Sequence, residues 1–178
     1  MYEHLAKLFG GPPNSDHFAL YTLWAKHNWG MIITGNVQVS PKHLSLGRDM
    51  VIPKFNTEEA LRPFQKLARA IKGGGNLPAE PLAIMQLSHA GRQSPNILGG
   101  RAPFERPLAP SAIALGSGKR GGNIISDIFY WLLFQTPKKM SVQNIDDVVD
   151  SFVRGANLAY LSGFDGVQLH AAHGCKWI

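Results

Sequence analysis

Cysteine is nearly absent from this 178-residue sequence, in which Cys175 is the only one. A disulfide within the chain is therefore excluded, and a reducing compartment is favoured. Long apolar runs are also missing, because Ser126 and Asp127 interrupt the most apolar window, residues 124–134, which is too short to span a membrane. The first residues carry charges and no sustained apolar segment, which argues against a secretory signal. We therefore expect a soluble, cytoplasmic protein with no membrane partner.

Runs of charge of one sign are missing as well. The chain has 18 Lys and Arg against 12 Asp and Glu, but its basic residues cluster only in short pairs such as Lys119-Arg120 and Lys138-Lys139. A nucleic-acid-binding protein would gather such charge on one face or in one run. The scattered charge therefore argues against a nucleic-acid partner.

Helix and strand patterns alternate along the chain. Apolar periodicity and turn residues predict helices over residues 16–29, 56–71 and 142–162, each followed by a strand, over residues 31–37, 81–87 and 167–169. The predicted helix-capping residues are the cluster Asn14-Ser15-Asp16, Asn56 with Glu59 in a capping box, Ser141 and, at the end of the last helix, Gly163. The strands are almost continuously apolar, which is typical of a parallel sheet covered by helices.

Two α/β folds fit this order, a doubly wound sheet and a β/α barrel. No Gly-x-Gly-x-x-Gly turn follows a predicted strand, which weakens the dinucleotide-binding alternative. The polar residues that could take part in chemistry are Gln86, His89, His170 and His173. All of them lie at the carboxyl ends of predicted strands, where barrels place their active sites. We expect one domain over residues 1–178.

A long segment rich in glycine and proline, residues 94–140, separates the second strand from the third helix. A loop of this length within a domain is usually functional. We expect Arg92 to pin this loop, and the aromatic residues 129–131 to pack within it or to form a subunit contact. If these aromatic residues form a subunit contact, the chain would associate into an oligomer, and the sequence does not decide this.

His170 and His173 are the candidate catalytic pair. Two imidazoles three residues apart at a strand end can donate hydrogen bonds to one substrate oxygen. They could instead hold a zinc ion together with His89, as in a metal-dependent hydrolase on a barrel. No carboxylate base can be named at the same end, so we rank the metal site below the oxygen-binding role and expect His89 to be structural.

Four segments resemble the Old Yellow Enzyme family of FMN-dependent oxidoreductases. They are residues 32–37 (IITGNV), 86–95 (QLSHAGRQSP), 109–112 (APSA) and 163–174 (GFDGVQLHAAHG), and they occur in the family's order and spacing. The resemblance implies a TIM-type (β/α) barrel with parallel strands and outer helices that holds FMN at its carboxyl-end mouth. The chain would be the N-terminal portion of such a barrel, lacking the later strands.

The resemblance also implies a reaction and roles for particular residues. Hydride would pass from NAD(P)H to FMN and then to an alkene conjugated with a carbonyl group, so the partner is a small α,β-unsaturated carbonyl substrate. Gln86 would hydrogen-bond the flavin ring, Gly35 would lie against it, and His170 and His173 would hold the substrate's carbonyl oxygen. Where the family carries a proton-donating tyrosine, this chain has Cys175. The alternative is a catalytically inactive fragment that acts, if at all, by binding another protein.

Overall fold

The computed structural model describes residues 3–75, 77–115 and 124–172. Its helices are α1 (Ser15–Ala25), α2 (Glu58–Ile71), α3 (Ile124–Leu133) and α4 (Val142–Leu161). Its strands are β1 (Met31–Gln38), β2 (Met50–Val51), β3 (Leu82–Ser88), β4 (Leu108–Ala109), β5 (Lys138–Lys139) and β6 (Gly166–Leu169). The predicted alternation of helix and strand is therefore confirmed.

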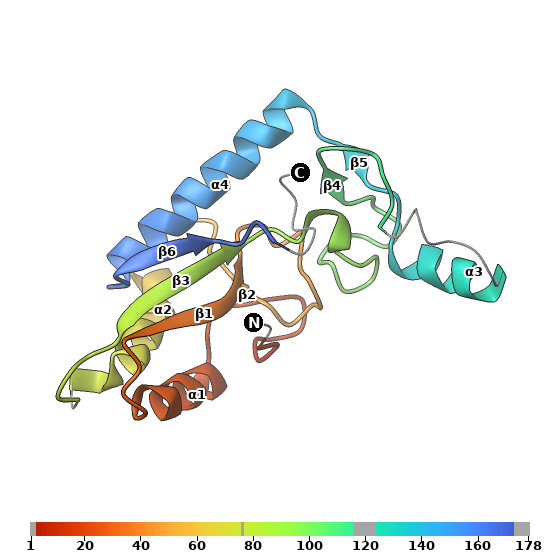
Figure 1. The fold of residues 1–178 in the computed structure, drawn as a ribbon. Helices are drawn as coiled ribbons and strands as arrows, with labels where there is room; N and C mark the ends of the chain where they lie inside the picture. Colours follow the sequence, from red (N-terminus) through yellow and green to blue (C-terminus); the bar gives the residue numbers. More distant parts are fainter. Residues whose placement is uncertain (1–2, 76, 116–123, 173–178) are drawn as a thin grey trace.

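The main sheet has four strands in the order β2-β1-β3-β6, and all of its pairings are parallel. Helices α1, α2 and α4 pack into a single hydrophobic core on one face of this sheet. Figure 1 shows these helices along one side of the sheet, with the segment carrying β4, α3 and β5 beyond the carboxyl ends of the strands. A doubly wound sheet would carry helices on both faces, so this arrangement matches the barrel prediction.

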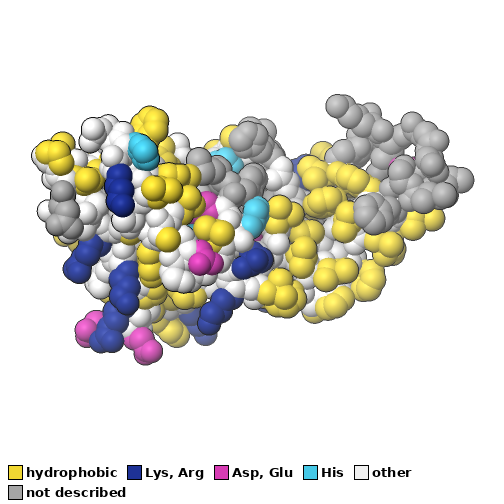
Figure 2. Space-filling model, turned by 90° about the horizontal axis from the view of Figure 1, so that it is seen from below, with side chains coloured by type: hydrophobic (Ala, Val, Ile, Leu, Met, Phe, Trp, Pro, Cys, Tyr) yellow, Lys and Arg dark blue, Asp and Glu magenta, His cyan; other side chains and the backbone are white. Residues whose placement is uncertain are grey.

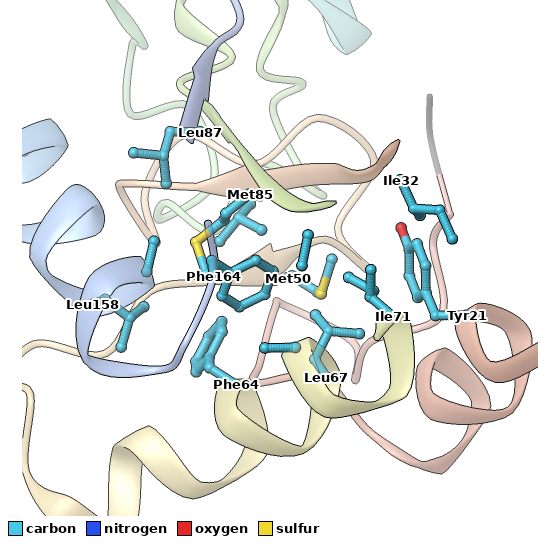
Figure 3. Close-up of a cluster of buried hydrophobic side chains, with 14 of the residues drawn as sticks. Tyr21, Ile32, Met50, Phe64, Leu67, Ile71, Met85, Leu87, Leu158 and Phe164 are labelled. Atoms are coloured by element: carbon cyan, nitrogen blue, oxygen red, sulfur yellow. The ribbon is translucent and has the colours of Figure 1, made fainter. Parts of the chain in front are cut away.

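The core lies between the sheet and the helices, and Figure 3 shows its largest members. Phe64 and Leu67 from α2, Met85 and Leu87 from β3, and Leu158 from α4 all belong to this buried cluster. The exposed fractions of all these side chains are 1% or less. Alternate residues of β3 thus face the helices, and the residues between them, such as Gln86, face the other side of the sheet.

Most of the predicted helix-capping residues are confirmed, but α1 ends at Ala25 and not at the predicted residue 29. The Asn14 side chain caps α1 by accepting from the Asp16 and His17 N–H groups, and Ser141 caps α4 by accepting from Asn144. Gly163 follows α4 with a φ of +81°, the left-handed conformation predicted for it.

The predicted cap of α2 is wrong by one residue. Thr57 is the N-cap, and its side chain accepts from the Ala60 N–H, while the Asn56 amide donates instead to the Arg154 carbonyl oxygen at 3.5 Å. Asn and Thr are both good caps, so their order in the sequence does not decide between them. The distant contact with α4 takes Asn56 away from the helix end.

The segment 94–140 contains more structure than the predicted loop. It includes α3, whose apolar sequence is long enough for almost three helical turns, and the short parallel pair β4–β5. The guanidinium of Arg101 ties it to the main body by donating to the Lys42 carbonyl oxygen, and it also donates to the Ser94 and Pro95 carbonyl oxygens within the segment. Arg92 donates to the Ser111 hydroxyl at 3.0 Å, so its predicted role in pinning the segment is confirmed.

Hydrophobic side chains gather on the surface of this same segment. Ile97, Phe104, Ile128 and Trp131 are each more than half exposed. Figure 2 shows a yellow, hydrophobic area at the end of the molecule that carries α3. The Trp131 and Phe104 rings lie 6.3 Å apart, so the predicted packing of the aromatic residues within the segment holds for Trp131. Among the described residues, no helix combines the length and the apolar character needed to cross a lipid bilayer.

Candidate functional site

Three amide side chains form a row across the sheet near the carboxyl ends of its strands. Asn36 on β1 is the register partner of Gln86 on β3, which is in turn the partner of Gln168 on β6. Because their neighbours Val37 and Leu87 belong to the core under the helices, the amides occupy the opposite face. In a barrel that face lines the interior, where the predicted site lies.

Gln86 stands at the centre of this row with its side chain almost fully buried, at 8% residue exposure. Its Nε2 donates to Oε1 of Gln168, whereas its own Oε1 is buried without a hydrogen-bond partner among the described residues. An unsatisfied buried acceptor costs about 1–3 kcal/mol, so such an atom indicates a place for a missing donor. Oδ1 of the neighbouring Asn36 is likewise buried without a hydrogen-bond partner among the described residues.

β1 has a bulge at Thr34 and Gly35, and through it the Thr34 side chain links Gly35 to Gln86. The register between β1 and β3 shifts between Ile33 and Asn36, which leaves Thr34 and Gly35 opposite a single residue of β3. The Thr34 hydroxyl accepts from the Gln86 N–H at 3.0 Å and donates to the Gly35 carbonyl oxygen at 2.8 Å. Thr34 therefore holds the two predicted flavin-contacting residues in one hydrogen-bonded unit.

Gly35 is held from its other side by a buried polar group. Its N–H donates to Oε1 of Glu3 at 2.7 Å and to the Tyr21 hydroxyl at 2.8 Å. A Cβ at this position would lie 2.6 Å from the Glu3 side chain, so only glycine fits without a shift.

Burial changes the acidity of the groups beside Gly35. The Glu3 side chain is only 4% exposed, and burial raises the pKa of its carboxyl from 4.5 to about 7, against the opposing effect of the bond from Gly35. His17 lies close by, with 3.8 Å between its Nε2 and Oε2 of Glu3, and burial lowers the pKa of its imidazole. At neutral pH the Glu3 carboxyl is therefore about half protonated, and the His17 imidazole is mainly neutral.

His170 lies directly after β6 and is half-buried. Its N–H donates to the Leu87 carbonyl oxygen at 2.9 Å, which continues the parallel pairing of β6 with β3 by one residue. Since side chains alternate along a strand, His170 falls on the same face as Gln168. His173 and Cys175 lie outside the described residues, so their predicted roles stay predictions.

His89 has a structural environment. It stacks on His43 with 4.3 Å between ring centroids, and its Nδ1 accepts from the Gly91 N–H at 3.2 Å. Burial, assisted by the nearby His89 and Arg101, lowers the pKa of the His43 imidazole. In the part of the chain that the structure describes, no three His, Cys, Asp or Glu side chains form a group suited to a metal ion.

One hollow lies far from these residues. It measures about 600 Å³ and lies at the opposite end of the sheet, between the ends of α2 and α4, where Arg69, Lys72 and Ser162 contribute to its lining. In barrels this end contributes to stability, whereas chemistry takes place at the carboxyl ends of the strands. The amide row therefore remains the candidate site.

The roles of Glu3, Thr34, Asn36 and Gln168 in this site were not predicted from the sequence. Thr34 and Gln168 lie inside the matched segments, and Gln168 precedes His170 by the two residues that place both on one face of a strand. That spacing could have identified Gln168 as a residue of the site from the sequence. Nothing local marks Glu3, because its partner Gly35 is 32 residues away.

A family model described as the NADH:flavin oxidoreductase / NADH oxidase family matches residues 9–175 of the chain. An NADH-dependent flavin oxidoreductase, iliE, of Neonectria sp. (strain DH2) is 40% identical over 166 residues, which are 91% of this chain and 20% of that protein. A protein of the same description from Hypocrea jecorina (strain QM6a) is 32% identical over 166 residues, or 93% of this chain and 39% of its own length. The chain thus spans well under half of these relatives.

Solved structures share the fold. The Old Yellow Enzyme homologue of Zymomonas mobilis superimposes with a TM-score of 0.72 at 23% identity, over 99% of this chain and 44% of that one. Morphinone reductase in complex with tetrahydroNAD gives a TM-score of 0.68 at 23% identity, over 93% of this chain and 42% of its own. The sheet and its helices are therefore part of a TIM-type (β/α) barrel, as predicted.

Proposed function

Because the chain belongs to the NADH:flavin oxidoreductase / NADH oxidase family, we propose that it forms part of the FMN site of an NAD(P)H oxidoreductase that reduces alkenes conjugated with a carbonyl group. The supporting observation is the Gln86 carboxamide, which is buried on the inner face of the sheet with an unpartnered Oε1. The ring system of FMN carries an N–H flanked by two carbonyl groups, which is the kind of donor this oxygen lacks.

The other residues around Gln86 also fit a flavin. Gly35 has no side chain to obstruct the approach of a planar ring, and Thr34 holds its carbonyl oxygen in a fixed place. Asn36 adds a second unpartnered acceptor in the same row. When bound, FMN would accept a hydride from NAD(P)H and pass it to the alkene.

His170 and His173 would bind the substrate's carbonyl oxygen. Two imidazole N–H donors stabilise the negative charge that develops on this oxygen when the β-carbon receives a hydride. The α-carbon must then gain a proton. In this chain the Cys175 thiol occupies the sequence position of the family's tyrosine, so either this thiol or water would supply the proton.

The test is the visible absorption spectrum of the chain after incubation with excess FMN and desalting. We expect a retained flavin band with a shifted maximum, and we expect Gln86→Leu to weaken FMN binding roughly tenfold or more because it removes the acceptor. Gln65→Leu, the same change at an exposed glutamine of α2, should leave binding unchanged. Reduction of an enone by NADH or NADPH is then the activity assay.

A non-catalytic, partner-binding role is the second candidate. The observation in its favour is the apolar outer face of α4, where Val142, Val153 and Tyr160 are each more than half exposed. The same experiment separates the two. A protein that retains no flavin, and for which Gln86→Leu changes nothing, would contradict the oxidoreductase proposal and favour the binding role.

A further inference from the structure

We propose that Gln168 is a positioning residue that sets the direction in which Gln86 presents its carboxamide to the flavin. Through its Oε1, Gln168 accepts the Nε2–H of Gln86, so the Oε1 of Gln86 is left for the ligand. The site would then offer the flavin ring an acceptor at this point rather than a donor. This inference rests on the proposed function and adds to it the basis on which the ring edge is recognised.

The sheet brings these two side chains together. Gln86 and Gln168 are register partners on the neighbouring parallel strands β3 and β6, so their side chains leave the same face at the same level. The backbone of Gln86 is fixed independently, because its N–H donates to the Thr34 hydroxyl at 3.0 Å. The backbone bond does not fix the orientation of the Gln86 carboxamide. Among the described residues, the hydrogen bond that orients it is the one to Gln168.

A glutamine side chain can exchange the places of its oxygen and nitrogen by a half-turn of the amide. If Gln168 offers its oxygen, Gln86 must use its NH₂ group there and turn its oxygen to the ligand. Gln168→Glu offers only oxygen atoms and therefore enforces this direction. Gln168→Met keeps a similar length and shape but has no strong acceptor, so it releases the Gln86 amide.

The binding experiment compares FMN with its N3-methylated analogue, which cannot donate a hydrogen bond from that nitrogen. The wild-type chain and Gln168→Glu should prefer FMN by roughly tenfold or more, the effect of leaving a buried acceptor without a donor. In Gln168→Met the preference should fall to a fewfold at most. Gln65→Met, at an exposed glutamine on α2, should keep the wild-type preference.

A second measurement does not depend on flavin. In the ¹⁵N-labelled chain without ligand, the side-chain NH₂ resonances of Gln86 should shift in Gln168→Met and stay hydrogen-bonded in Gln168→Glu. Unchanged resonances in Gln168→Met, or an FMN preference equal to that of the wild type, would overturn the positioning role. If the resonances shift but the wild-type chain binds neither flavin, the proposed function fails and the pair is a structural bond only.

Discussion

Leu87 and Leu169 occupy equivalent places on neighbouring strands of one sheet, yet one is buried and the other is not. They are register partners in β3 and β6, and both fall on the helix-facing side. Leu87 is 0% exposed, whereas Leu169 is 63% exposed. The pair one step earlier differs in the same way, with Met85 at 0% and Val167 at 39%.

The difference arises from what covers each strand. Helix α4 crosses β3 so closely that a Cβ on its Gly155 would lie 2.9 Å from a methyl carbon of Leu87. Leu158 of the same helix is also fully buried in this core. Strand identity and register therefore do not determine burial, which depends on whether a helix reaches the residue. The two leucines give a matched pair on which this can be measured.

Leu87→Ala should produce the largest loss of stability. Truncating a fully buried leucine removes its transfer free energy and leaves a cavity, at a cost of about 2–5 kcal/mol. Urea denaturation of the variant and the wild-type chain measures this loss. A cost below about 1 kcal/mol would contradict the packing described for α4 over β3.

The pH dependence set by Glu3 should be the next largest effect. Its pKa is about 7 in the folded chain against 4.5 when unfolded, so the folded state holds the proton more tightly. Its contribution is therefore fully present below pH 4.5 and is lost as the pH rises through 7. Between pH 5 and pH 8 we expect a loss of about 2–3 kcal/mol.

Glu3→Gln serves as the reference in that measurement, because it keeps the shape and removes the titration. His17 acts in the opposite direction, since burial lowers its pKa and its protonation destabilises the fold at low pH. The relevant quantity is therefore the difference between the two chains, measured by urea denaturation at both pH values. Equal slopes with pH would show that Glu3 is not held at Gly35 as described.

The three longer strands of the sheet were predicted from the sequence to within one residue at each end, the uncovered β6 included. Apolar periodicity located β1, β3 and the helices around them, because burial under helices selects those residues. It missed the partners Thr34 and Gln168, since the first depends on a bulge and the second on the register between strands. It also placed the cap of α2 at Asn56 instead of Thr57, because both residue types are good caps and the sequence does not show that Asn56 bonds to Arg154.

Leu169→Ala should have the smallest effect and therefore tests the comparison most sharply. A side chain that is 63% exposed loses little buried area on truncation, so we expect a change within about 0.5 kcal/mol. Urea denaturation at two protein concentrations measures it beside Leu87→Ala. A loss close to that of Leu87→Ala would mean that another surface covers β6 in solution. If that surface is a second copy of the chain, the loss should grow with protein concentration, because association stabilises only the folded state.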